Sequence, residues 1–404
     1  MKFNLQFWLK FSLINLCLVA FIGTVMRYKI GFEFPFLNQK NLQHSHSHFA
    51  FAGWVSHTLM VLMVYYLNSK LPKLQTTKYK YVIIANLIVA YGMLISFIYQ
   101  GYAMFSITFS TLSIVISYFF AYFYYKDLKS LAEQQVAVKW FKASLLFLVI
   151  SSIGTFSLAY MMATKTMTEQ PYLASIYYYL HFQYNGWFFF VCMGLLYDFL
   201  NLNRQNKFFL SAYQIFAFTC IPTYILSVLW LKLPLWLLIF TALCAFMQLY
   251  AWIHLVYIIV KTKLYPTQSF SKWLNIIAYL VAFSLSLKLV LQLASTIPAL
   301  STLTQSFRPI VIAYLHLVLL AVISLFLLYY IYAKRFFNFT KSACAALVIF
   351  TIAVFLNEFV LGVQGIAAFS YTLIPYVNES LFAIALLLFG SMLALFFNSK
   401  KEAK

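Results

Sequence analysis

Long apolar stretches, separated by short polar segments, run through the whole chain. A membrane-spanning helix needs about 20 mostly apolar residues. By that criterion the pattern predicts helices at approximately 7–26, 47–68, 81–103, 105–125, 140–163, 172–199, 209–230, 235–260, 271–295, 308–333, 342–365 and 379–398. We therefore expect an all-α fold: a polytopic transmembrane bundle of about twelve helices, forming one integral membrane domain over residues 1–404.

Composition and charge agree with this pattern. Hydrophobic residues make up 64% of the chain and charged residues 9%, whereas a soluble domain carries about 25% charged residues. The net charge of +20 does not indicate binding to nucleic acid, because the basic residues form short clusters between apolar stretches. Most clusters fall in segments that are cytoplasmic if the N-terminus is inside, so the positive-inside rule predicts that both ends are cytoplasmic. We expect a multi-pass protein of the cell membrane, of the bacterial inner-membrane type.

Histidines are the most unusual polar residues near the second apolar stretch. His44, His46 and His48 alternate at its start, and His57 follows inside it. Histidine is costly in hydrocarbon and usually serves a metal, a haem or a proton path. In a helix, His46, Gly53 and His57 would share one face, and His44 and His48 another. In an extended segment the three alternating histidines would share one side and suit a small metal site.

Further polar residues lie inside later apolar stretches. They are His181, Gln183, Tyr184, Asn185, Lys288, His316 and Glu358. Residue counts from the predicted helix ends place His181, His316, Lys288 and Glu358 at a similar depth in the outer half of the membrane, with His57 near it. Each histidine could instead make a hydrogen bond between helices, and Lys288 and Glu358 could form an internal ion pair.

At these residues the chain resembles the haem–copper oxidase superfamily, the large catalytic subunits of terminal oxidases and nitric oxide reductases. Members of that family have twelve helices, with haem-binding histidines on helices two and ten and a copper-binding histidine on helix six. The resemblance implies a haem b held by ligands among His46, His48, His57 and His316. It also implies a metal role, with copper as the metal, for His181, while His44 is a candidate metal ligand through its place among the alternating histidines. Hydrogen-bonding support for these ligands, or a proton path, is then expected from Tyr184, Asn185, Gln183, Lys288 and Glu358.

The chain departs from the family pattern at two helices. In the family, helix seven carries two copper-binding histidines and helix ten carries two haem-binding histidines. Here the seventh stretch, 209–230, has no histidine, so two copper ligands are missing. The tenth stretch, 308–333, has only one histidine. The resemblance then implies electron transfer, or chemistry linked to oxygen or nitric oxide, with an incomplete copper site. The electron donor would be a cytochrome or a quinol. If the protein is an enzyme, it is expected to be an oxidoreductase.

Two other classes of protein fit the same residues. A proton-coupled transporter or channel would also have many helices, short loops and buried charges such as Lys288 and Glu358. However, 11 glycines and 9 prolines give this chain few of the helix breaks that are common in carriers. The other class is a membrane protein that handles copper or zinc at His44, His46 and His48.

Overall fold

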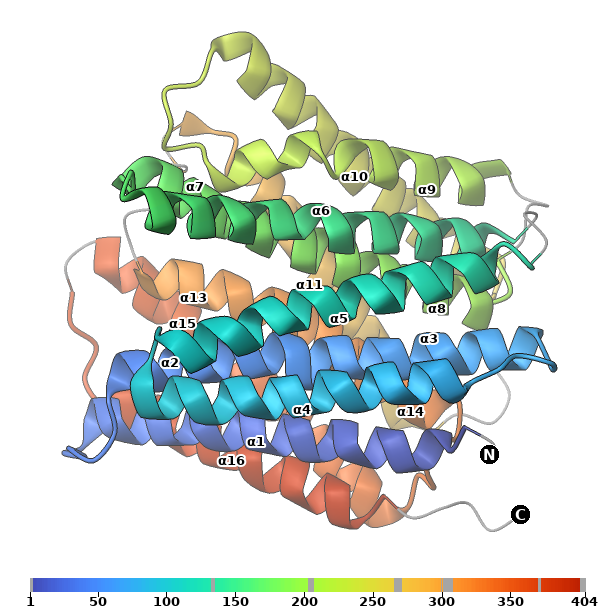
Figure 1. Ribbon diagram of the computed structural model, residues 1–404, viewed down its shortest axis with the longest axis horizontal. Helices are drawn as coiled ribbons and strands as arrows, with labels where there is room; N and C mark the ends of the chain where they lie inside the picture. Colours follow the sequence, from blue (N-terminus) through green and yellow to red (C-terminus); the bar gives the residue numbers. More distant parts are fainter. Residues whose placement is uncertain are drawn as a thin grey trace. The chain divides into compact units, whose positions relative to one another are not determined.

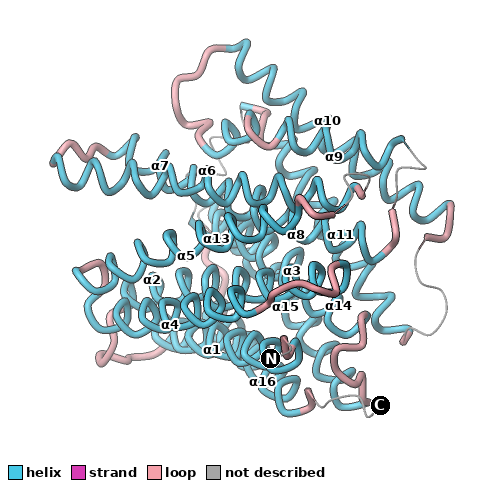
Figure 2. The backbone as a smooth tube through the Cα atoms, turned by 45° about the vertical axis from the view of Figure 1, so that its right-hand side comes forward, coloured by secondary structure: helices cyan, strands magenta, loops and turns pink. Residues whose placement is uncertain are grey.

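The computed structural model describes residues 3–131, 135–202, 207–264, 271–298, 300, 308–369 and 372–399. Within these ranges the regular secondary structure is helical throughout and no strand occurs (Figure 2). Ten helical stretches there are long and apolar enough to cross a membrane. The chain is therefore a multi-pass helical membrane protein, which confirms the predicted fold class. The number of about twelve spans and the cytoplasmic position of both ends stay predictions.

Two compact units divide the chain, and each is described by itself. Unit 1 comprises Met1–Tyr124, Ser271–Ala278 and Ser324–Lys404. Its helices are α1 (Leu5–Gly31), α2 (Gln39–Phe49), η1 (Ala50–Ser56), α3 (His57–Lys70), α4 (Thr77–Gln100), most of α5 (Met104–Leu128), α14 (Leu325–Ala333), α15 (Lys341–Phe369) and α16 (Val377–Phe397). The segment η1 is a π-helix that joins α2 and α3 without a break.

The span formed by α2, η1 and α3 is the most buried of unit 1. In Gln39–Lys70, 83% of the most apolar part is buried, against 17% in Met104–Leu128. The buried span packs against α1 and α4, and α1 also packs along α16 (Figure 1). The Thr24 hydroxyl ties α1 to α16 by donating to the Ala385 carbonyl at 3.0 Å. The histidine-bearing span is thus held inside unit 1, whereas most of α5 is partly or fully exposed.

This span begins eight residues earlier than its apolar pattern predicts. The structure starts α2 at Gln39, where the Asn38 side chain accepts from the backbone N–H groups of Lys40 and Asn41. An asparagine N-cap satisfies N–H groups that a helix start otherwise leaves unpaired. The polar residues that follow are therefore helical, and the extended arrangement of His44, His46 and His48 considered from the sequence is wrong.

The predicted helices at 81–103 and 105–125 are separate elements. The turn between α4 and α5 is made at Gly101, whose φ of +63° is readily reached only by glycine. A Cβ there would also lie 2.5 Å from Oδ1 of Asn41. The backbone conformation therefore favours glycine at this corner, and a Cβ would also displace the Asn41 side chain.

Unit 2 comprises Tyr125–Phe270 and Tyr279–Ile323. Its helices are α6 (Val136–Thr164), α7 (Glu169–His181), η2 (Phe182–Phe188), α8 (Phe189–Phe199), α9 (Lys207–Thr219), η3 (Pro222–Ser227), α10 (Leu235–Lys261), most of α11 (Lys272–Ala294), α13 (Arg308–His316) and most of η4 (Leu317–Ser324). The segments η2 and η4 are π-helices, and η3 is a 3-10 helix. In this unit α6 packs against α7, η2 and α8, and α9 packs against α10.

Candidate functional site

His46 and His57 both contact α1, which confirms the prediction that they share a helix face. The Nδ1 atom of His46 lies 3.1 Å from the carbonyl oxygen of Val19. Eleven residues later, the fully buried His57 places Nε2 3.4 Å from the carbonyl oxygen of Trp8. The remaining nitrogen of His57, Nδ1, is buried without a hydrogen-bond partner. Two imidazoles of one span are thus oriented by the backbone of the same neighbouring helix.

The π-helix η1, between these two histidines, is held by buried asparagines on both sides. Asn15 of α1 donates to the Gly53 carbonyl and accepts from the Tyr91 hydroxyl at 2.7 Å. Asn86 of α4 donates to the Ala52 carbonyl at 3.1 Å. Neither asparagine was predicted from the sequence. The signal that could have found them is a lone amide in an apolar stretch, because an unpaired amide in hydrocarbon is costly.

His44 and His48 face the corner between α4 and α5 and not α1. The His48 ring stacks on Phe97 with centroids 4.3 Å apart, and its Nε2 lies 2.9 Å from the Tyr102 hydroxyl. The His44 ring contacts Tyr102 edge-on at 4.6 Å, and its Nε2 is buried without a partner. The three alternating histidines are therefore divided between two faces, with His46 apart from the other two.

In unit 2, His181 faces the place where helix α9 ends. The backbone N–H of Tyr224 donates to the Ile221 carbonyl and not to the Cys220 carbonyl. Nε2 of His181 donates to the Cys220 carbonyl at 2.8 Å, and Nδ1 accepts from the Asn185 amide at 3.1 Å. The predicted support of His181 by Asn185 is thus present, and both ring nitrogens of this neutral imidazole are bonded within the protein.

The neighbours of Asn185 in sequence point to other helices. The hydroxyl of Tyr184, which is buried, makes a hydrogen bond with Ser227 of η3. Gln183 donates to the Ser151 hydroxyl of α6 at 2.9 Å. Both side chains fix η2 against its neighbours, and their expected role beside a cofactor stays a prediction.

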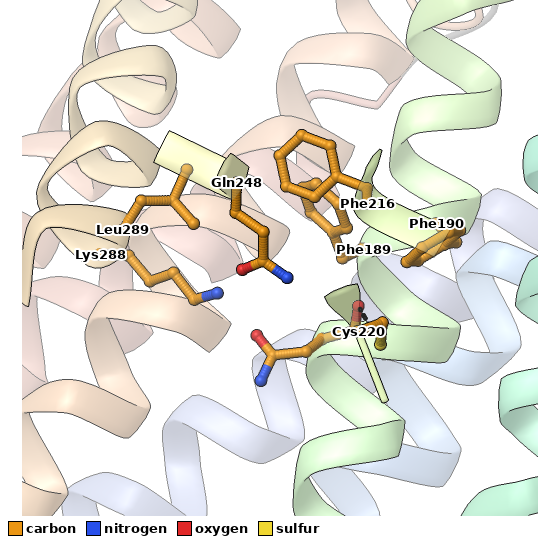
Figure 3. A pocket seen from close by; sticks show the side chains of 8 residues that line it. Phe189, Phe190, Phe216, Cys220, Gln248, Lys288 and Leu289 are labelled. Atoms are coloured by element: carbon orange, nitrogen blue, oxygen red, sulfur yellow. Dashed lines mark hydrogen bonds between the residues drawn. The ribbon is translucent and has the colours of Figure 1, made fainter. Parts of the chain in front are cut away.

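Lys288 lies in a small polar cavity of unit 2. Its lining is formed by Asn185, Phe189, Phe190, Phe216, Cys220, Gln248, Lys288 and Leu289. Figure 3 shows the Lys288 amine and the Gln248 amide directed into this cavity from two sides. Lys288 and Asn185 therefore line the same cavity. The sequence analysis missed Gln248, which like the asparagines of unit 1 is a lone amide in an apolar stretch.

Two predicted site residues have local partners. Nδ1 of His316, at the end of α13, lies 2.8 Å from the Ile312 carbonyl oxygen. Glu358, which is half-buried in unit 1, accepts from the Asn357 amide at 3.2 Å. Lys288 belongs to unit 2, so its pairing with Glu358 stays a prediction.

A π-helical segment adjoins a histidine on each of three spans. The segment η1 ends immediately before His57, η2 begins immediately after His181, and η4 begins immediately after His316. Such segments are rare and often occur at functional sites. Nothing in the apolar pattern predicts them, yet they mark the same three spans that the histidines mark.

Among the described residues, no group of three or more His, Cys, Asp or Glu side chains is arranged to hold a metal ion. The five cysteines are free thiols, four of them buried. Comparison with models of protein families gives no match, and a search for similar curated proteins gives none either.

Proposed function

We propose that this chain is a haem-binding membrane protein for electron transfer, or for chemistry linked to oxygen or nitric oxide, in which His46 of unit 1 and His316 of unit 2 are each a proposed ligand of haem iron. The supporting observation is how the two rings are oriented. Nδ1 of His46 lies 3.1 Å from the Val19 carbonyl oxygen, and Nδ1 of His316 lies 2.8 Å from that of Ile312. A carbonyl oxygen only accepts hydrogen bonds, so Nδ1 carries the proton and the lone pair is on Nε2.

This tautomer fits an iron ligand. A metal-binding histidine usually donates its second ring N–H to a carbonyl or carboxylate, which fixes the ring and raises its basicity. On α1, Gly23 lies against the His46 ring: a Cβ at Gly23 would be 3.4 Å from ring atom Cε1. The Val19 carbonyl and the adjacent glycine surface therefore position His46 from one helix. A b-type haem, when bound by two imidazoles, supplies one-electron redox chemistry and favours electron transfer over oxygen binding.

The other histidines fit less well. His57 has its lone pair on the buried Nδ1, because Nε2 faces the Trp8 carbonyl, and it is the alternative ligand on the same span. His48 uses Nε2 for the Tyr102 hydroxyl. Copper at His181 would require the Asn185 amide to turn away from Nδ1. A role for His44 would use its unpartnered Nε2.

The test is an absorption spectrum of the purified full chain, expressed with added haem, as the difference between dithionite-reduced and oxidised protein. We expect a Soret band and sharp α and β bands, as a low-spin haem produces. His46→Ala and His316→Ala should each lose the low-spin bands. His254→Ala is the matched control, because His254 of α10 packs against Phe208 and is not a proposed ligand.

Absence of a Soret band from the wild-type protein would dispose of haem binding. Unchanged bands in both His46→Ala and His316→Ala would overturn the choice of ligands, and loss of the bands in His57→Ala instead would favour His57. A spectral shift on adding carbon monoxide to the reduced wild-type protein would indicate an open iron coordination position and binding of oxygen or nitric oxide. The electron donor in this proposal is a cytochrome or a membrane quinol, and the location is the cell membrane.

A further inference from the structure

The amide orientation of Gln248 is fixed by its neighbours in unit 2. Its Nε2 donates to the Thr219 hydroxyl at 3.0 Å and approaches that of Thr223 at 3.5 Å. The Thr219 hydroxyl gives its only proton to the Ile215 carbonyl at 2.6 Å, so it can only accept from Gln248. The amide oxygen of Gln248 must then face the cavity, and Figure 3 shows it on the side of the Lys288 amine.

Asn185 is oriented by the same kind of argument. Because Nε2 of His181 donates to the Cys220 carbonyl, Nδ1 of His181 is an acceptor, and it takes the Asn185 amide N–H. The amide oxygen of Asn185 is the part left for the cavity that this residue lines. Both amides therefore donate their N–H groups to protein partners, and their acceptor oxygens are left facing the cavity.

Lys288 supplies the only formal cation of this cavity, and no carboxylate lines it among the described residues. The side chain of Lys288 is 6% exposed. Gln292, one helical turn later on α11, lies on the same side of the helix. It is also 6% exposed, and its amide oxygen is buried without a hydrogen-bond partner. Gln292 does not line the cavity, but its buried amide oxygen is a third acceptor on the helix face that carries the amine.

The cavity itself is small and polar. About 10 Å³ is open to the centre of a water-sized sphere, which is room for about one water molecule. An anion in this space would meet two amide oxygens and would find N–H donors only on Lys288. A positive charge would meet acceptor oxygens, which is the arrangement that an ammonium group with three N–H bonds requires.

We propose that Lys288, Gln248, Asn185 and Gln292 form a proton-binding site within the membrane. The Lys288 amine takes one proton from water to become an ammonium ion and later returns it to water, while the amide oxygens accept the N–H bonds of the charged form. The other titratable groups near the amine are the Cys220 thiol at the end of α9 and the His181 imidazole at the end of α7. The site does not depend on haem binding and would serve redox-linked or transport-linked proton movement equally.

The experiment measures thermal unfolding of the purified full chain in detergent between pH 5 and pH 10. Lys288→Met removes the amine and keeps a chain of similar length, and Lys232→Met removes an exposed lysine of the same unit as the control. We expect the difference in Tm between wild type and Lys288→Met to change with pH. This Tm difference should change by about 2–4 °C for each unit by which folding shifts the pKa of the amine. The difference for Lys232→Met should stay constant.

A difference that does not vary with pH for Lys288→Met would overturn the proposal. If that variant yields no folded protein, Lys288→Arg takes its place, because arginine keeps its charge at every pH used. Its Tm profile should lack the titration seen in wild type, and a profile identical to wild type would equally refute the site. Replacing chloride by gluconate should leave all profiles unchanged, whereas a Tm of wild type that rises with chloride would show an anion site instead. None of these readouts uses the Soret band, so failure here is distinct from failure of the haem proposal.

Discussion

Replacing Gly154 by alanine tests the close packing of α6 against α7, the helix that ends at His181. A Cβ at Gly154 would lie 2.5 Å from the Ser175 carbonyl oxygen and 2.9 Å from the Tyr179 nitrogen, both backbone atoms of α7. Ordinary contact begins at 3.4 Å, so the helices would have to separate by about 0.9 Å. Overpacking of this kind costs about 1–3 kcal/mol, and alanine returns about 0.5–1 kcal/mol through its helix propensity. We expect a net loss of stability of up to about 2.5 kcal/mol.

The matched control is Gly390→Ala on α16, where nothing lies within 4 Å of the added Cβ. Alanine at this position should be neutral or stabilising by about 0.5–1 kcal/mol, because only the propensity term acts. Reversible unfolding in mixed detergent micelles would give both free energies of unfolding. If Gly154→Ala and Gly390→Ala change the free energy equally, α6 and α7 do not approach as described, and the reasoning fails.

Three further predictions concern buried hydrogen bonds. Asn15→Leu should lower the free energy of unfolding by about 1–3 kcal/mol, because two interhelical bonds are lost at about 0.6–1.7 kcal/mol each. Tyr91→Phe, which removes one of them, should cost about half as much in the same unfolding assay, and equal costs would contradict the network. Trp54→Phe and Ser324→Ala should show a coupling of about 0.6–1.7 kcal/mol in a double-mutant cycle, because Trp54 Nε1 donates to the Ser324 hydroxyl at 2.8 Å. Nitrogen-15 spectra of labelled histidine should contain an Nε2–H tautomer that disappears in His181→Phe, and an Nδ1–H signal at that position would refute the assigned bonds.

The helical fold could be predicted because apolar stretches of about 20 residues leave few alternatives in a membrane. The early start of α2 could not, because hydropathy falls over its polar residues while the Asn38 cap and the packing against α1 and α4 still favour helix. The π-helical segments could not be predicted either, because their backbone pattern depends on tertiary partners such as the Asn15 and Asn86 side chains.

The candidate site was predictable where helix periodicity alone decides the outcome. The contact of Asn185 with His181, four residues apart, follows from a turn of about 100° per residue. The acceptor-lined cavity around Lys288 was not predictable, because it depends on which way the Gln248 amide is turned by residues of another helix. Periodicity identifies the face of a side chain, but hydrogen bonds decide which atom is presented.

The π-helical segment Ala50–Ser56 has a consequence for insertions and deletions. One residue more than a regular α-helix rotates everything that follows by about 100° about the helix axis. Deleting a single residue there would restore an even winding and swing His57 away from the Trp8 carbonyl while leaving the upstream histidines in place. Related chains should accordingly vary in length at their loops, but keep the spacing between His46 and His57 fixed.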